Sequence, residues 1–337
     1  MPLGAPHAAD DAKAASSGES IIRLTIRARL QRRLERLARD RAVGLGEAMS
    51  VAIMVVEHEA GRVLARVGTP DYFDLDRAGQ VDLTRAVRSP GSTLKPFIYG
   101  LGFEDGLVHP ESLIEDRPIR FGDYAPENFD QTFQGTVTVR RALQQSLNVP
   151  AVSLLDAVGP SRLLARLGEA GAQLKLPEHE TAGLALGLGG IGIRLADLTA
   201  LYAGLARQGN VAPLYERETA PRWPTKRLME PVAAWYVGDV LRDAPPPPHA
   251  VGGQIAFKTG TSYGYRDAWA VGLDGRYTVG IWTGRPDGAP VPGLLGRTAA
   301  APILFDVFAR LTEQPRPLRP APEGVLRART AQLPPPL

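Results

Sequence analysis

The strongest fold signal in this chain of 337 residues is a pair of apolar runs close to its C-terminal end. Residues 268–272 and 277–282 are joined across Asp274 and Gly275. An Asp-Gly pair between apolar runs favours a tight hairpin turn, because both residues tolerate the backbone conformations that such turns require. The two runs are therefore predicted to be neighbouring antiparallel strands.

Further strands and helices are predicted on both sides of this hairpin. Residues 51–56 and 62–67 have the composition of strands and predict a second hairpin around Gly61. Residues 25–39 and 299–311 have the apolar spacing of amphipathic helices. We expect the C-terminal strands to pair with the first hairpin. The predicted fold class is α+β, with a central antiparallel β-sheet flanked by helices.

The composition predicts three regions along the chain. Residues 1–20 are rich in alanine, aspartate, serine and glycine, and are predicted to be a flexible lead. A chain of 337 residues is long enough to bury a large core in one domain plus flanking elements. Residues 313–337 are rich in proline and are expected to be an extended tail. We find no run of about 18 apolar residues, which a membrane-spanning helix needs.

The net charge and the amino-acid composition exclude several kinds of partner and chemistry. The formal net charge of +3 is too small to predict a nucleic-acid partner. The chain contains no cysteine, which excludes disulfides and thiol catalysis. Its histidines lack the spacing of a metal site, so no metal and no cofactor is expected. The glycine-rich residues 187–192 fit a dinucleotide-binding pattern, but no β-branched strand leads into them, and a glycine-rich turn near the functional site is predicted instead.

The first of three short motifs is Ser92-Thr-Leu-Lys95, which begins an apolar run with helical spacing. Ser92 and Lys95 are predicted to share one face at the N-terminus of this helix, where Pro96 is tolerated. A lysine that is held out of water can lose its proton far below its usual pKa and then accept a proton from a serine hydroxyl. The simpler interpretation is a solvated serine and lysine on a surface helix.

The second motif, Ser146-Leu-Asn148, follows a segment with a helical inner face and precedes Pro150. A serine at this turn could relay a proton, and an asparagine could hold a peptide amide with its carbonyl and NH₂ groups. The alternative is that Asn148 only caps the preceding helix.

The third motif is Lys258-Thr-Gly-Thr-Ser262, predicted to lie on or beside a strand of the sheet. Thr259 and Thr261 flank Gly260, and two hydroxyls next to an ammonium group can bind a carboxylate. The glycine lets a substrate backbone come close. The alternative interpretation is a bulge at Gly260 and a surface charge at Lys258 on an edge strand.

In this order, the three motifs resemble the Ser-x-x-Lys, Ser-x-Asn and Lys-Thr-Gly set of penicillin-binding transpeptidases and serine β-lactamases. The resemblance covers residues 21–312 and is to the transpeptidase domain of class A penicillin-binding proteins. Residues 257–272 and 284–288 are most similar to the penicillin-binding protein 1C subfamily. The other similar segments are residues 124–128, 134–137, 141–151, 184–190 and 201–206.

The resemblance implies a role for each motif residue. Ser92 would attack the penultimate D-alanine carbonyl of a peptidoglycan stem peptide, with Lys95 as the base. Lys258 would help to keep Lys95 neutral, and Ser146 would pass a proton to the departing D-alanine. The backbone amides of Ser92 and Thr261 would form the oxyanion hole.

The remaining motif residues would bind the substrate. Asn148 would hold the amide of the donor peptide, and Lys258, Thr259 and Thr261 would hold its terminal carboxylate. Gly260 and Ser262 complete the predicted substrate-binding set.

The resemblance also implies partners and a location. The expected ligands are peptidoglycan stem peptides, or the lipid-linked precursor polymer, and β-lactam antibiotics. The expected location is the periplasm, or the extracytoplasmic face of the bacterial inner membrane. A glycosyltransferase domain and a membrane anchor are expected upstream in the parent protein, outside this chain. Two alternatives remain open: a serine β-lactamase, although no Glu-x-x-Leu-Asn string is present, and a non-catalytic penicillin-binding sensor or scaffold.

Overall fold

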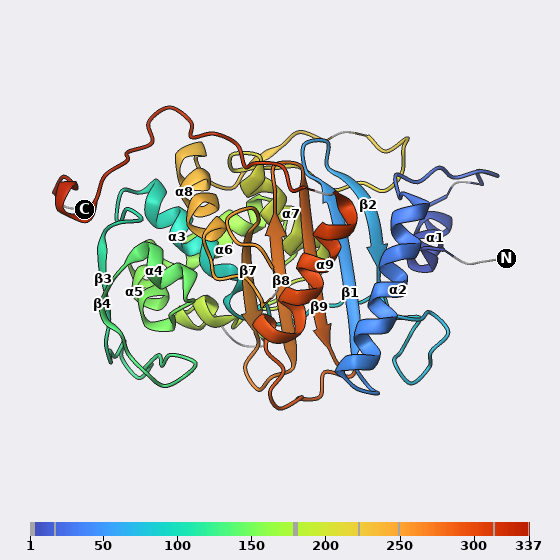
Figure 1. The fold of residues 1–337 in the computed structure, drawn as a ribbon, viewed down its shortest axis with the longest axis horizontal. Coiled ribbons are helices and arrows are strands. Elements are labelled where there is room, and N and C mark those ends of the chain that lie inside the picture. The colour runs from blue at the N-terminus through green and yellow to red at the C-terminus, as the bar shows by residue number, and fades with distance from the viewer. Residues whose placement is uncertain are drawn as a thin grey trace.

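Strands from both ends of the chain form one central antiparallel sheet (Figure 1). The computed structural model describes residues 4–16, 18–177, 181–221, 223–248, 250–312, 314–335 and 337. The five strands lie in the order β2-β1-β9-β8-β7, so β2 and β7 are the edges. Their bounds are β1 Ser50–Glu57, β2 Arg62–Val67, β7 Ala256–Thr261, β8 Asp267–Leu273 and β9 Tyr277–Gly284.

Both predicted hairpins are confirmed, and so is their pairing. Strand β8 pairs with β9, and β9 pairs with β1 from Ser50 opposite Gly284 onward. Asp274 shapes the β8–β9 turn, because its Oδ1 accepts the backbone N–H groups of Arg276 at 2.8 Å and Tyr277 at 2.6 Å. The Asp-Gly signal thus marks a real turn with a side chain that stabilises it.

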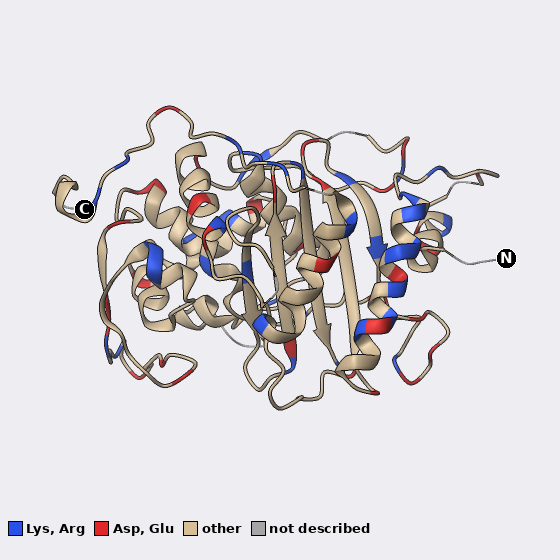
Figure 2. Cartoon of the chain, in the orientation of Figure 1, with Lys and Arg blue, Asp and Glu red and all other residues tan. Residues whose placement is uncertain are grey.

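Helices cover both faces of the sheet and give it two apolar cores. Alternate residues of β1 point to opposite faces, so Met54 enters one core and Val55 the other. On the first face lie α3 Lys95–Glu104, α7 Leu195–Ala206 and α8 Pro231–Arg242. The second face is covered by α2 Ala28–Leu45 and α9 Ala301–Leu311, and basic residues recur along α2 (Figure 2).

Smaller elements fill the space beside the sheet. The further helices are α4 Val139–Gln144, α5 Asn148–Val158 and α6 Pro160–Glu169, and two short ribbons pair β3 Leu113–Asp116 with β4 Gly135–Thr138 and β5 Asn210–Val211 with β6 Lys226–Arg227. Single turns are η1 Gly91–Leu94, η2 Leu184–Leu188, the π-helical η3 Gly296–Ala300 and η4 Thr330–Gln332. In the described part of the chain, every helix falls short of the length or apolar character that a membrane span requires.

The N-terminal segment departs from the sequence prediction. Within the predicted flexible lead, Pro6–Ala14 forms helix α1, which buries His7, Ala8 and Ala12. His7 Nε2 lies 2.9 Å from the carbonyl oxygen of Gly79. Alanine is the strongest helix former and proline is favoured in a first turn, so the composition that suggested flexibility also suits a docked helix.

The proline-rich tail contains the short turn η4, and it docks on the domain. Gly275 donates its N–H to the carbonyl oxygen of Arg316 at 2.8 Å. Farther along, the backbone N–H of Leu326 donates to the hydroxyl of Tyr236 at 2.8 Å, and that hydroxyl donates back to the Leu326 carbonyl at 2.9 Å.

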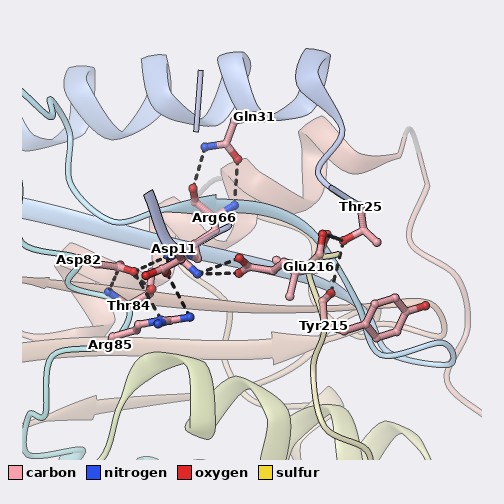
Figure 3. A network of polar contacts seen from close by, with 10 residues as sticks. Asp11, Thr25, Gln31, Arg66, Asp82, Thr84, Arg85, Tyr215 and Glu216 are labelled. Atoms are coloured by element: carbon pink, nitrogen blue, oxygen red, sulfur yellow. Dashed lines mark hydrogen bonds and ion pairs between the residues drawn. The ribbon is translucent and has the colours of Figure 1, made fainter. Parts of the chain in front are cut away.

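A buried arginine on the edge strand β2 joins segments that are far apart in the sequence (Figure 3). The side chain of Arg66 is 2% exposed and forms ion pairs with Asp11 of α1, with Asp82 at 2.9 Å and with Glu216 at 2.8 Å. Gln31 of α2 donates to the Arg66 carbonyl at 2.7 Å and accepts its N–H at 2.9 Å. These bonds occupy the backbone of an edge strand that would otherwise be open to pairing.

Replacing Arg66 with alanine is expected to lower the free energy of unfolding by about 3–5 kcal/mol, because the partly buried carboxylates of Asp82 and Glu216 lose their buried partner. Urea denaturation measures the change. The control is Arg85→Ala, since Arg85 also pairs with Asp11 but is 52% exposed and should contribute less than about 1 kcal/mol. Similar losses in both variants would contradict a special role of the buried guanidinium.

Candidate active site

Ser92 and Lys95 lie on one short turn that leads into helix α3. Ser92 is in the 3₁₀ turn η1, and α3 begins at Lys95, so the prediction that Ser92 starts the α-helix itself is wrong by one turn. The N–H of Lys95 donates to the carbonyl of Ser92, a spacing that aligns side chains three residues apart. The two side chains therefore share a face, as the motif predicts. Pro96 falls in the first turn of α3, where it is tolerated.

The Lys95 side chain is fully buried, which excludes the interpretation of a solvated surface lysine. Its Nζ donates to the carbonyl oxygens of Ser146 at 2.6 Å and Leu147 at 3.0 Å, and to Oδ1 of Asn148 at 2.6 Å. The second motif thus surrounds the amine of the first. Ser146 has a φ of 61°, and this left-handed turn aims its carbonyl group and those after it at Lys95.

Asn148 begins helix α5 and does not cap α4, so the capping alternative is wrong. Both ends of its side-chain amide form hydrogen bonds. Oδ1 accepts from Lys95, and Nδ2 donates to the carbonyl of Glu127 at 2.7 Å.

Lys258 completes a cluster centred on the hydroxyl of Ser146. It lies on β7 and is 3% exposed, so it is no surface charge. Its Nζ donates to Ser146 Oγ at 2.7 Å and to the carbonyl of Thr259 at 3.0 Å. Lys95 Nζ lies 3.5 Å from the same Oγ. Ser146 is therefore positioned between two amines and could pass a proton from one side of the site to the other.

Burial changes the protonation of both lysines. Removal from water lowers the pKa of Lys95 well below its usual value, the positive charge of Lys258 lowers it further, and Asp116 opposes the shift. Burial lowers the pKa of Lys258 to about 7. Near neutral pH the cluster can therefore contain a neutral amine, which is what a proton acceptor for a serine hydroxyl requires.

Gly260 and Gly91 allow the edge strand to touch the turn that carries Ser92. A Cβ at Gly260 would lie 2.4 Å from the Pro90 carbonyl oxygen, and one at Gly91 would lie 2.3 Å from that of Thr261. The pairing of β7 with β8 is regular across these residues, so the predicted alternative of a bulge is wrong. Gly91 also has a φ of 52°, which other residues adopt reluctantly.

The backbone amide of Thr261 faces this contact. Ser262 donates its N–H to Asp267 at 2.9 Å, and donors alternate along an antiparallel strand, so the N–H of Thr261 points away from β8 toward the η1 turn. The predicted oxyanion-hole residues, Ser92 and Thr261, are thus on adjoining segments. Among the described residues, no group forms a hydrogen bond with Ser92 Oγ.

The structure separates the other residues of the third motif. Thr259 and Thr261 project from the opposite side of β7 to Lys258, and both are partly exposed. Thr261 Oγ1 accepts the N–H of Gly296 at 3.0 Å. Ser262 is buried, and its Oγ accepts the N–H of Asp267 at 2.8 Å, so its side chain closes the β7–β8 turn instead of joining the cluster.

Sequence reasoning missed two residues that hold the second motif in place. Asn128 Oδ1 accepts the N–H of Asn148 at 2.7 Å, and its Nδ2 donates to the buried carboxylate of Asp116 at 2.7 Å. Asn128 lies in one of the segments that carry the family resemblance, which was the available signal. Asp116 ends β3, and no local pattern distinguishes it from other aspartates.

The glycine-rich residues 187–192 form the predicted turn near the site. Gly189, with a φ of 94°, lies against Gly91, and its carbonyl accepts the hydroxyl of Ser89 at 2.7 Å. The carbonyl of Ser89 accepts the indole N–H of Trp269 at 2.8 Å. The turn and the sheet thus fix the loop before Ser92.

Gly260→Ala is expected to destabilise the protein by about 1–3 kcal/mol, because its Cβ would force the η1 turn away from β7. Urea denaturation measures this loss. In the control Gly168→Ala, a Cβ meets nothing within 4 Å in helix α6, so stability should stay the same or rise by up to about 1 kcal/mol. A neutral Gly260→Ala would show that the contact is not tight.

The lowered pKa of Lys258 predicts a pH dependence of stability. Its folded pKa of about 7 lies below the ordinary value of 10.5, so between these pH values the unfolded chain binds more protons. Stability should therefore rise with pH in this window. From pH 7.5 to 9.5, wild type should gain about 2–3 kcal/mol over Lys258→Met in urea denaturation. An unchanged difference would mean that the folded state keeps Lys258 protonated.

Comparisons with known proteins agree with this geometry. The family described as the penicillin-binding protein transpeptidase domain matches residues 51–284. The chain is 46% identical over 307 residues to penicillin-binding protein 1C of Escherichia coli K12, covering 88% of this chain and 40% of the relative. It is 30% identical over 258 residues to penicillin-binding protein 4 of Bacillus subtilis 168, covering 68% and 39%. The chain thus spans about 40% of the length of these relatives.

Solved structures share this fold. The PonA1 protein from Mycobacterium tuberculosis in complex with penicillin V superposes with a TM-score of 0.78 at 20% identity, over 94% of this chain and 92% of that one. This likeness confirms the predicted α+β fold, and the sequence relatives confirm the predicted resemblance. The chain belongs to the family of penicillin-binding protein transpeptidase domains.

Proposed function

We propose that this chain is a peptidoglycan D,D-transpeptidase domain that forms peptide cross-links through an acyl-enzyme on Ser92. The observation that carries the proposal is the buried amine of Lys95, one 3₁₀ turn from Ser92 and in contact with Ser146 and Asn148. A buried amine with a lowered pKa, one turn away from a serine hydroxyl that no described group engages, is suited to activate that serine as a nucleophile.

The first half of the reaction forms the ester. Ser92 Oγ attacks the penultimate D-alanine carbonyl of a stem peptide while Lys95 accepts the hydroxyl proton. The three oxygens around Lys95 Nζ then hold the ammonium group that forms. The amides of Ser92 and Thr261 bind the oxyanion, and such a donor contributes about 3–4 kcal/mol in comparable sites.

The second half moves a proton and exchanges amines. Ser146, in contact with both lysines, passes the proton to the nitrogen of the departing D-alanine. The amine of a second stem peptide then attacks the ester and takes the acyl group, which restores the Ser92 hydroxyl and completes the cross-link. No metal or cofactor takes part in these steps.

The substrate would be held at both ends of its scissile bond. Asn148 binds the donor amide after exchanging its bond to the Glu127 carbonyl. Lys258 and, from the opposite side of β7, Thr259 and Thr261 would bind the terminal carboxylate at the open edge of this strand, and Gly260 would let the substrate backbone approach. Ser262 would act indirectly, because its hydroxyl stabilises the adjoining turn.

The proposed partners and location follow from this chemistry. The substrates would be peptidoglycan stem peptides, free or in the lipid-linked precursor polymer, and β-lactams would acylate Ser92 as substrate mimics. The reaction would take place outside the cytoplasm, in the periplasm or at the outer face of the inner membrane. In the parent protein we expect an upstream glycosyltransferase domain and membrane anchor, in keeping with relatives about two and a half times as long as the matched part.

The Ser92→Ala and Lys95→Ala variants should not be acylated by a panel of penicillins, whereas wild type should form a stable one-to-one adduct on Ser92. The reason is that an unactivated serine is a poor nucleophile at neutral pH. Time-resolved intact-mass spectrometry measures the adduct, and consumption of a chromogenic β-lactam should stop after about one equivalent. Ser161→Ala, an exposed serine on α6, is the matched control and should behave as wild type.

The same measurement separates the alternatives. Turnover of several molecules per second, typical of enzymes, would identify a β-lactamase. An unlabelled wild type with every compound would identify a non-catalytic sensor or scaffold. Covalent labelling of Ser92→Ala would overturn the assignment of the nucleophile.

A further inference from the structure

Positive charge is concentrated in one short segment of the chain, far from the site already described. Residues 23–41 contain eight arginines and two acidic residues, a larger surplus than the +3 of the whole protein. The arginines are Arg23, Arg27, Arg29, Arg32, Arg33, Arg36, Arg39 and Arg41. All eight are exposed.

Most of this charge forms a stripe along α2, which we name the arginine face: Arg29, Arg32, Arg33, Arg36 and Arg39 (Figure 2). Their spacing of three and four residues places them on one side of the helix, opposite the leucines that enter the core. In the described part of the chain, none of the five is paired with a carboxylate. Like charges at this spacing repel, so the stripe destabilises the helix it lies on.

A shallow hollow adjoins the arginine face. It has a volume of about 350 Å³ and lies between α2 and α9, where Arg33, Arg36 and Arg310 line it together with Asp40. Guanidinium groups bind carboxylates through two parallel hydrogen bonds. The hollow could therefore seat one anionic group while the rest of the stripe contacts others.

The arginine face is separate from the proposed active site. Helix α2 packs on strands β1 and β2, at the opposite side of the sheet from β7. It also covers the other face of the sheet from α3, which follows Ser92. An occupant of the arginine face would leave the Ser92 site open.

We propose that the arginine face binds carboxylate-bearing stem peptides of the cell-wall polymer, at a site distinct from the one where the reaction occurs. This inference rests on the proposed function, which supplies the polymer. Each stem peptide that ends in D-alanine has a free carboxylate, and the polymer repeats that charge, which complements a stripe about 15 Å long from Arg29 to Arg39. Tethering raises the local concentration of substrate peptides near Ser92.

The structure favours a polymer over a lipid bilayer as the occupant. Helices that bind bilayers insert an apolar face into the lipid, but the apolar face of α2 is buried against the sheet through Leu30, Leu34 and Leu37. Between Arg29 and Arg39 the exposed face carries charged side chains and no large apolar one; the exposed Val43 lies beyond this stretch. Binding should therefore weaken steeply as salt screens it.

The test is co-sedimentation of the protein with purified cell-wall sacculi at low and high salt. Arg29→Gln, Arg32→Gln and Arg36→Gln combined should weaken binding at least tenfold. The matched control, Lys13→Gln, Arg141→Gln and Arg329→Gln combined, removes the same charge from exposed side chains elsewhere and should bind as wild type. Glutamine is a good helix former, and urea denaturation verifies that both variants are folded.

Three further measurements decide the occupant. Sacculi whose carboxylates are converted to neutral amides should lose binding, and wild type with Ser92 acylated by penicillin should retain it. Equal binding by the α2 variant, unchanged binding to amidated sacculi, or preferential binding to vesicles of anionic phospholipid would overturn the proposal. Acylation of Ser92 is scored separately in each variant, so a failure of the proposed function is distinguishable from a failure of this tether.

Discussion

The contact between the η1 turn and the edge strand β7 is the constraint on which the candidate site depends. Glycines at 91 and 260 let the two backbones approach to a distance that any side chain would prevent. The contact fixes Ser92 relative to Thr261, and α3 then carries Lys95 inward to the Ser146 turn. A chain without these two glycines could keep every polar residue of the motifs and still fail to align them.

Burial is what turns two ordinary lysines into candidate acid–base groups. Both side chains are buried, and each amine gains compensating contacts with oxygens: three for Lys95 within 3.0 Å, and two for Lys258. These contacts make it possible to bury an amine at all, because an unpaired polar group inside a protein is strongly destabilising. Asp116, held by Asn128, opposes the lowered pKa of Lys95 and so limits how far that pKa falls.

The sequence predicted those structural features that a few neighbouring residues determine. The Asp274 turn, both hairpins and the shared face of Ser92 and Lys95 were all predictable in this way. Residues that act through the tertiary fold were not: Asp116 reaches the site only because the β3–β4 ribbon folds beside α5. Ser262 is a case in which the local motif misled. Its place in the motif suggested substrate binding, but its hydroxyl accepts the N–H of Asp267 and stabilises the β7–β8 turn.

The use of lysine or arginine also depends on whether a basic residue is buried in the candidate site or exposed on α2. Of the 39 basic residues only five are lysine, namely Lys13, Lys95, Lys175, Lys226 and Lys258, and two of these five form the buried pair. Lysine can lose its proton when it is removed from water, whereas arginine stays charged. Arginine at either buried position would remain a cation and could not accept a proton from serine. Arginine on α2 keeps a permanent charge at every pH at which the protein is folded, which suits a surface that acts by attraction alone.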